Sequence, residues 1–123
     1  MPLSGVHVLI VDDHDDTRDI LEQTLRFQGA IVTSVATARE ALAAVPRATI
    51  VVADFVMPGE DGVWLLEQIN QRPSPVPVIA LTGLAESQHR RLAAAPFARK
   101  LLKPVDPFDL GAEILRVLNM RLG

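Results

Sequence analysis

The sequence predicts an α/β fold in which a parallel sheet of five strands is doubly wound with five helices. Short apolar runs alternate with longer stretches of helical periodicity five times along the chain. Such alternation favours parallel strands joined by right-handed crossovers. A length of 123 residues and a hydrophobic content of 49% are enough for one domain, spanning 1–123, with its own core. The absence of cysteine excludes disulfides and thiolate metal sites.

Five apolar runs predict the strands, and they span Val6–Val11, Ile31–Val35, Ile50–Ala53, Val76–Leu81 and Ala98–Leu102. The first is nearly continuously apolar, as expected of a strand buried on both faces of a parallel sheet. The second is more polar, and the fifth contains Arg99 and Lys100. We therefore expect the second and fifth strands at the edges of the sheet.

Helical spacing predicts one helix after each strand. Gly29, Pro46 and Pro73 mark the ends of the first three helices, and Asp106–Pro107 opens the last as N-cap and first residue. The apolar residues that share a helix face are, in chain order, Ile20, Leu21, Leu25 and Phe27; Ala38, Ala41, Leu42 and Val45; Gly62, Leu65, Leu66 and Ile69; Leu92 alone in a poorer helix over Glu86–Ala95; and Leu110, Ile114, Val117 and Leu118. Leu115 and Leu122 widen the last apolar face, which favours a partner contact there.

Polar side chains follow four of the five predicted strands. Asp12 and Asp13 end the first, Asp54 the third, Thr82 the fourth and Lys103 the fifth. Ligands of open α/β sheets bind beyond the carboxyl ends of the strands. Clustered carboxylates stay ionised only beside positive charge, and a hard divalent ion such as Mg²⁺ supplies it. Lys103 and Thr82 would suit phosphoryl oxygens, and Asp54 is placed to act as a nucleophile.

Simpler interpretations exist for each of these residues. Asp12 and Asp13 are also suitable N-capping residues for the first helix, Thr82 could simply end a strand, and Lys103 could be an ordinary surface lysine. Their joint occurrence at the strand ends favours the phosphoryl site. Elsewhere, we expect Asp61 to cap the third helix.

Four blocks, VDDHDDTRDIL, VVADFVMPGEDG, ALTG and LLKP, resemble the signature of the two-component response-regulator receiver domain over roughly Gly5–Leu122. The resemblance implies a flavodoxin-like sheet with strand order 2-1-3-4-5. It also implies that Asp54 is the phospho-acceptor. Asp13 would bind Mg²⁺, or Mn²⁺ in its place, directly, and Asp12 through water, with the backbone carbonyl of Val56 as a further ligand.

The same resemblance makes Lys103 the phosphate-binding lysine, followed by a cis bond to Pro104, and Thr82 the switch hydroxyl. One departure concerns the usual switch aromatic three residues before the lysine, which is replaced here by Lys100. A second concerns the positions that tune dephosphorylation, which are Val56 and Leu84. Neither side chain can orient a water by hydrogen bonding, so we expect a long-lived phospho-aspartate.

These observations predict a receiver of a two-component phosphorelay that takes a phosphoryl group from a sensor histidine kinase or a histidine phosphotransfer protein. It would catalyse only its own phosphorylation and dephosphorylation. One alternative is a phosphorylation-independent adaptor, which Lys100 keeps open. Another is a Mg²⁺-dependent phosphohydrolase, although the chain has no substrate-binding insertion.

The remaining expectations concern location and partners. A net charge of −3 argues against direct nucleic-acid binding, and the apolar runs are too short for a membrane span. We expect a cytoplasmic protein with no output domain, either a stand-alone receiver or a piece of a larger regulator or hybrid kinase.

Overall fold

The computed structural model describes residues 1–122, leaving out Gly123 and the side chains of Gln88, Arg121 and Leu122, so the predicted contact of Leu122 lies outside the described part. The sheet has five parallel strands in the order β2-β1-β3-β4-β5, as predicted. The elements are β1 (His7–Val11), α1 (Asp15–Phe27), β2 (Ile31–Val35), α2 (Ala38–Ala44), the 3₁₀ turn η1 (Val45–Arg47), β3 (Ile50–Asp54), α3 (Gly62–Asn70), β4 (Val78–Thr82), the 3₁₀ turn η2 (Glu86–Gln88), α4 (Arg90–Ala94), β5 (Arg99–Leu102) and α5 (Pro107–Leu122).

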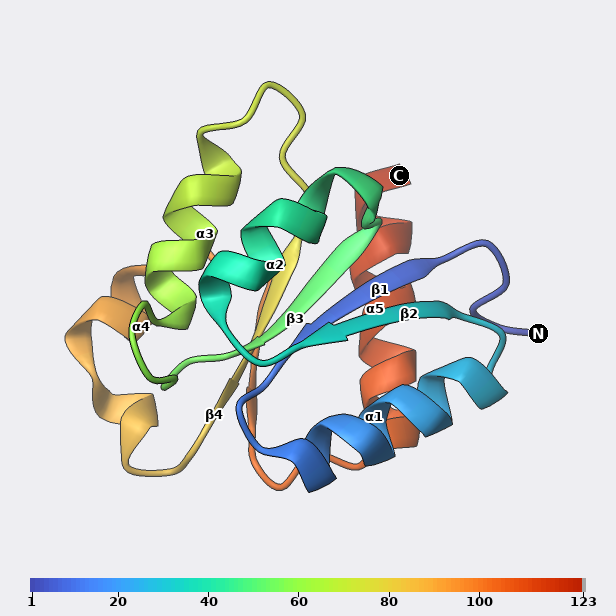
Figure 1. Ribbon diagram of the computed structural model, residues 1–123, viewed down its shortest axis with the longest axis horizontal. Helices are drawn as coiled ribbons and strands as arrows, with labels where there is room; N and C mark the ends of the chain where they lie inside the picture. Colours follow the sequence, from blue (N-terminus) through green and yellow to red (C-terminus); the bar gives the residue numbers. More distant parts are fainter. Residues whose placement is uncertain (123) are drawn as a thin grey trace.

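Helices cover both faces of the sheet, α1 and α5 on one and α2 and α3 on the other (Figure 1). Successive residues of the central strands point to opposite faces, because side chains alternate along a strand. In β3, Val51 and Ala53 pack toward α2 and α3, whereas Ile50 and Val52 pack toward α1 and α5. Every residue of β3 and β4 is buried, so the two strands that end in Asp54 and Thr82 have a rigid setting.

The outer strands are β2 and β5, as their polarity predicted. Arg99 and Lys100 of β5 are exposed. Beside them, the single predicted helix over Glu86–Ala95 is wrong in detail. It is divided into η2 and the five-residue α4 by His89, whose backbone is extended. Leu92 is the only buried residue of α4, and one apolar contact gives little support to a longer helix.

Two helix faces also differ from expectation. In α1, Leu21 and Leu25 are buried four residues apart, whereas Ile20 and Phe27 are 57% and 70% exposed. A step of one or two residues turns a side chain by about 100° or 200° around a helix, so these two leave the buried stripe. In α5, Leu115 packs partly against the core and belongs to it. Pro46 ends α2 as predicted, but the chain continues one turn further as η1.

The helix starts and stops are set by particular residues. Gly29 has a φ of 102°, which glycine adopts without strain, and it follows the end of α1. Asp61 Oδ1 accepts a hydrogen bond from the Trp64 N–H at 2.9 Å, so Asp61 caps α3 as predicted. Asp106 Oδ1 accepts from the Phe108 N–H at 2.8 Å at the start of α5. No helix among the described residues has the length and apolar character needed to cross a membrane.

A close backbone approach at Gly62 positions the end of β3. The Gly62 N–H donates to the Phe55 carbonyl at 2.9 Å, and a Cβ at Gly62 would lie 2.7 Å from the Asp54 carbonyl oxygen. The start of α3 thus touches the backbone of the strand end that carries Asp54.

Gly62→Ala should therefore lower stability by about 1–3 kcal/mol, because two backbone segments must move apart. Thermal unfolding followed by circular dichroism measures the effect. Gly111→Ala is the matched helical control: its Cβ would meet the end of the Gln28 side chain, which can rotate away. An equal loss of stability in both variants would contradict the prediction.

Candidate functional site

The candidate site lies where the carboxyl ends of the strands meet. Asp12 directly follows β1, Asp54 is the last residue of β3, Thr82 is the last of β4, and Lys103 directly follows β5. Asp12 and Asp54 are 1% exposed and Thr82 is 2% exposed. Among the described residues, these three are the buried polar ones. The concentration of buried polar groups at the carboxyl ends of the strands, in a sheet whose other buried residues are apolar, marks this end as the functional one.

The sheet ladder holds each of these residues in place through its backbone. The Asp12 N–H donates to Val35 O at 3.1 Å, which extends the pairing of β1 with β2. The Lys103 N–H donates to Thr82 O at 2.7 Å, which extends the pairing of β4 with β5. The Lys103–Pro104 peptide bond is cis, as the resemblance implies. The sequence therefore brings these groups together through strand register, without relying on flexible loops.

Asp54 and Lys103 form an ion pair through Asp54 Oδ1 and Lys103 Nζ. Burial raises the pKa of Asp54 to about 6. The Asp12 and Asp13 charges add to this rise, and the hydrogen bond and charge of Lys103 oppose it. Burial alone would lower the pKa of Lys103, but the hydrogen bond and charge of Asp54, together with Asp12 and Glu86, raise it. Lys103 is consequently a permanent cation, and Asp54 is mainly ionised at neutral pH.

Oxygens suited to a cation lie close together here. Ligand atoms of Asp12, Asp13, His14 and Asp54 are all within 4.8 Å of one another. Asp12 Oδ2 and Asp54 Oδ2 are buried and accept no hydrogen bond from the described part of the chain. Buried carboxylate oxygens without partners are costly, and hard oxygen ligands are those that Mg²⁺ prefers. The donor set therefore fits a divalent cation.

His14 belongs to this cluster, although the sequence alone assigns no role to this residue close to the strand ends. The backbone N–H of His14 donates to Asp12 Oδ1 at 2.8 Å, and the ring Nδ1 lies 3.4 Å from both Asp12 Oδ1 and Asp13 Oδ1. His14 is also the N-cap residue of α1, without a side-chain capping bond. The N-capping alternative for Asp12 and Asp13 is thus not what the structure shows, since both precede the N-cap.

Three other positions singled out from the sequence carry exposed side chains. Val56 and Leu84 are 52% and 75% exposed and apolar. Lys100 is exposed, and its Nζ donates to the carbonyl of Ala93 in α4 at 3.0 Å. Lys100 therefore ties β5 to α4, and it forms no ion pair with an acidic side chain in the described part of the chain.

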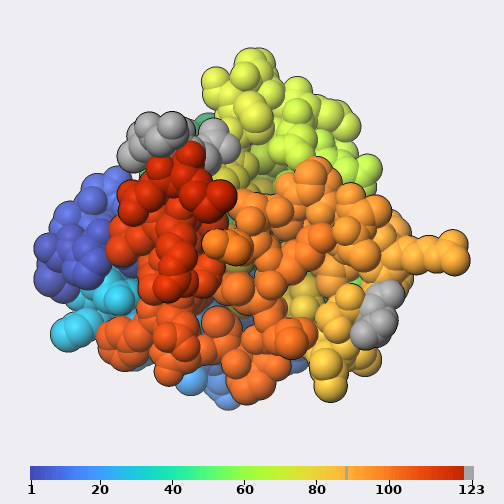
Figure 2. Space-filling model, turned by 180° about the vertical axis from the view of Figure 1, so that it is seen from behind, coloured from blue at the N-terminus to red at the C-terminus, as the bar shows by residue number. Residues whose placement is uncertain are grey.

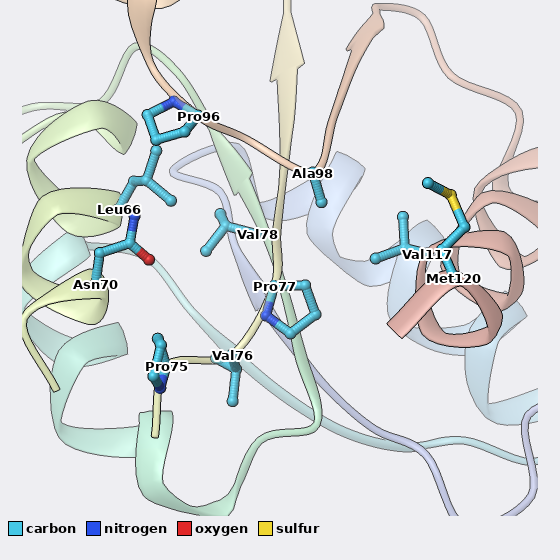
Figure 3. Close-up of a pocket in the computed structure, with 10 residues that line it drawn as sticks. All are labelled: Leu66, Asn70, Pro75, Val76, Pro77, Val78, Pro96, Ala98, Val117 and Met120. Atoms are coloured by element: carbon cyan, nitrogen blue, oxygen red, sulfur yellow. The ribbon is translucent and has the colours of Figure 1, made fainter. Parts of the chain in front are cut away.

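A separate apolar cavity of about 360 Å³ lies at the opposite end of β4 (Figure 3). Leu66 and Asn70 of α3 form one wall, Val117 and Met120 of α5 another, and Val76–Val78 lie between them. None of its lining residues is titratable. The ionisable side chains of the candidate site therefore lie at the other end of the strands, away from this cavity.

The fold and the site define a class: a doubly wound sheet with a buried aspartate, neighbouring acidic residues and a lysine at its carboxyl edge. The family model described as "Response regulator receiver domain" matches residues 8–115. The chain belongs to the response-regulator receiver family, which confirms the resemblance of its four sequence blocks.

Curated relatives agree with this assignment. An uncharacterized 14.6 kDa protein in the sodA1 3′ region of Leptolyngbya boryana is 40% identical over 113 residues, covering 88% of this chain and 86% of that protein. The DNA-binding transcriptional regulator NtrC of Salmonella typhimurium is 40% identical over 120 residues, covering 91% of this chain. This chain spans only 24% of that regulator.

Solved structures share the whole fold. A receiver domain from Clostridium thermocellum has a TM-score of 0.85 at 25% identity, covering 94% of this chain and 96% of that one. A CheY-like receiver from Methanospirillum hungatei JF-1 has a TM-score of 0.80 at 31% identity, covering 94% of both chains.

Burial of Asp54 yields a prediction about stability. Because its pKa is raised from 3.8 to about 6 on folding, the folded state prefers the protonated acid. Stability is therefore lost as pH rises from about 4 to about 6. Asp54→Asn removes this cost, so without Mg²⁺ the variant should be about 3 kcal/mol more stable than the wild type at neutral pH.

Urea unfolding at several pH values measures the difference. It should shrink toward zero below about pH 3, where the wild-type acid is protonated in both the folded and the unfolded state. Asp19→Asn, a change at an exposed position of α1, is the control and should show no such trend. A constant difference between pH 4 and pH 7 would contradict the interpretation.

Proposed function

We propose that the protein is a phospho-acceptor of a two-component phosphorelay, with Asp54 as the residue that is phosphorylated. The donor would be a phosphohistidine of a sensor histidine kinase or a histidine phosphotransfer protein in the cytoplasm. The observation that carries the proposal is the buried Asp54 carboxylate, paired with Lys103 and surrounded by unbonded acidic oxygens. Under this proposal the chain catalyses only its own phosphorylation and dephosphorylation.

The chemistry is a phosphoryl transfer between a nitrogen and an oxygen. A carboxylate oxygen of Asp54 attacks the phosphorus, an O–P bond forms and the P–N bond of the donor breaks. The electron pair stays on the imidazole nitrogen, which takes up a proton. Asp54 can act as the nucleophile at neutral pH because its pKa of about 6 leaves it mainly ionised. Such transfers depend chiefly on positioning and on neutralising charge.

Two side chains would receive the transferred group. Lys103 already forms an ion pair with Asp54. Its ammonium would bind a phosphoryl oxygen as negative charge accumulates there during the transfer. Thr82 ends the neighbouring strand and offers a hydroxyl donor from a buried position. The difference between the contacts of the free and the phosphorylated pocket would supply the energy that shifts the protein between two states.

The acidic cluster would hold Mg²⁺, or Mn²⁺ in its place. Asp13 and Asp54 would bind directly, Asp12 through water, and Val56 through its backbone carbonyl. When bound, the ion supplies positive charge that offsets the repulsion between the carboxylates and the incoming phosphoryl oxygens. The unbonded Asp12 Oδ2 and Asp54 Oδ2 support this assignment.

The proposal predicts a gain of one phosphoryl group on incubation with acetyl phosphate and Mg²⁺, measured by intact-mass spectrometry. Omitting Mg²⁺ should reduce the gain by at least about tenfold, because the carboxylates would then repel the phosphoryl oxygens. Asp54→Ala should abolish it, whereas Asp19→Ala should leave it unchanged. A folded wild type that gains no mass would favour the phosphorylation-independent adaptor.

The apolar rim of the pocket predicts slow dephosphorylation. Val56 and Leu84 flank the site with side chains that cannot hydrogen-bond a water. Val56→Gln, which places an amide at the rim, should accelerate loss of the phosphoryl group by about threefold or more by orienting water. Val56→Leu is the matched apolar control. Decay of the wild type as fast as that of the glutamine variant would contradict the prediction.

A further inference from the structure

One acidic side chain near the pocket has no role in the function described so far. Glu86, the first residue of η2, accepts a hydrogen bond at its Oε2 from the N–H of Gly83, with a distance of 2.7 Å. Gly83 directly follows Thr82 at the end of β4. The carboxylate thus occupies the backbone donor next to the residue that would bind the phosphoryl group.

The charge of Glu86 reaches the centre of the pocket. It is among the charges that raise the pKa of Lys103, whose Nζ lies on Asp54. A phosphoryl group on Asp54 would therefore add negative charge near the Glu86 carboxylate, which is hydrogen-bonded to Gly83 beside Thr82. Like charges at close range repel most strongly where solvent is partly excluded, and Glu86 is only partly exposed.

The segment that carries Glu86 leads directly into α4. The carbonyl of Glu86 accepts from the N–H of His89 at 2.9 Å, and His89 begins α4 as its N-cap. The His89 ring meets Phe55 edge-on, with ring centres 5.3 Å apart. Phe55 directly follows Asp54. The loop from Gly83 to His89 is thus held at both ends by neighbours of the pocket residues.

Among the described residues, no side chain of β5 makes a comparable link between the pocket and α4. Lys100 stands where a switch aromatic would be expected, and its ammonium is engaged with Ala93 O on the exposed side of β5. Figure 2 shows the segment containing α4 and β5, in orange, beside α5, in red, at the surface of the molecule. A change in the pocket can reach this surface through the Gly83–His89 loop.

We propose that Glu86 is a positioning residue that holds Gly83 and η2 in the unphosphorylated arrangement, and that a phosphoryl group on Asp54 displaces it and thereby moves α4. The inference rests on the proposed phosphorylation of Asp54. It adds that the chain itself opposes the reaction, because the negative charge of the Glu86 carboxylate repels the incoming phosphoryl group until the carboxylate is displaced. Removing its charge should both ease phosphorylation and shift α4.

The test uses the ¹⁵N-labelled full chain with acetyl phosphate and Mg²⁺. Intact mass gives the phosphorylation rate, and amide NMR spectra follow Gly83, His89 and Arg91. Glu86→Gln should be phosphorylated about threefold faster or more, as expected for the loss of one partly screened like charge. Before phosphorylation, its amide signals should already lie part of the way along the line between the unphosphorylated and phosphorylated wild type.

Two further variants separate the possible causes. Glu86→Asp keeps the charge on a shorter side chain, so its rate should stay within about twofold of the wild type. Glu40→Gln is the matched control, because Glu40 also lies in a first helical turn and bonds a residue three positions earlier, Thr37. It should change neither the rate nor the signals of Gly83 and His89.

Each contrary result has a distinct meaning. If Glu86→Gln matches the control variant in rate and in α4 amide positions while the wild type is phosphorylated, the role of Glu86 is overturned and the function of Asp54 stands. Faster phosphorylation without movement of the α4 signals would also overturn the proposal, because the Glu86 charge would then affect only the reaction at Asp54 and would not position α4. Failure of the wild type to be phosphorylated would overturn the proposed function, and this inference with it.

Discussion

The ionised carboxylate of Asp54, buried at the end of a fully buried strand, is the constraint on which the rest of the site depends. Burying a charge is costly unless a partner compensates for it. Lys103 pairs with Asp54, but Asp12 and Asp13 add two further negative charges to the same pocket. The cluster remains undercompensated, as the raised pKa of Asp54 reflects. The fold therefore loses stability at the carboxyl ends of the strands, where, under the proposed function, a cation and a phosphoryl group would bind.

Strand register explains why this site could be predicted from the sequence. Asp12, Asp54, Thr82 and Lys103 each end a strand, and parallel strands place such residues at one edge whatever their loops do. His14 and Glu86 could not be found in this way. Their positions depend on the local path of a turn and of η2, where no periodic pattern constrains the chain. The same reason explains α4, since a polar segment with Leu92 as its only buried residue specifies neither its length nor its start.

The weak packing of α4 has a consequence for function. Segments with few buried contacts move at low cost, and elements that switch are drawn from them. Polar contacts add to the burial of Leu92 and to the contact of the His89 ring with Phe55: Arg91 pairs with Asp61, the N-cap of α3, and Lys100 bonds Ala93 O. Hydrogen bonds and ion pairs at exposed positions contribute little and can be exchanged for water. Movement of this helix would therefore disturb the core beneath α2 and α3 chiefly at Leu92.

Under the proposed switch, Lys100 would link movement of α4 to β5. Because its ammonium joins β5 to the carbonyl of Ala93, movement of α4 must either carry the Lys100 side chain along or break the bond and release a cation at the surface. Both outcomes change the charge and shape of the α4–β5 surface. A partner that binds one of the two surfaces more tightly must, by thermodynamic linkage, favour the corresponding state of Asp54 by the same factor. Under the proposed function, Lys100 stands where the family's usual aromatic residue would be, and it would transmit movement of α4 to the exposed side of β5 through its bond to Ala93 O.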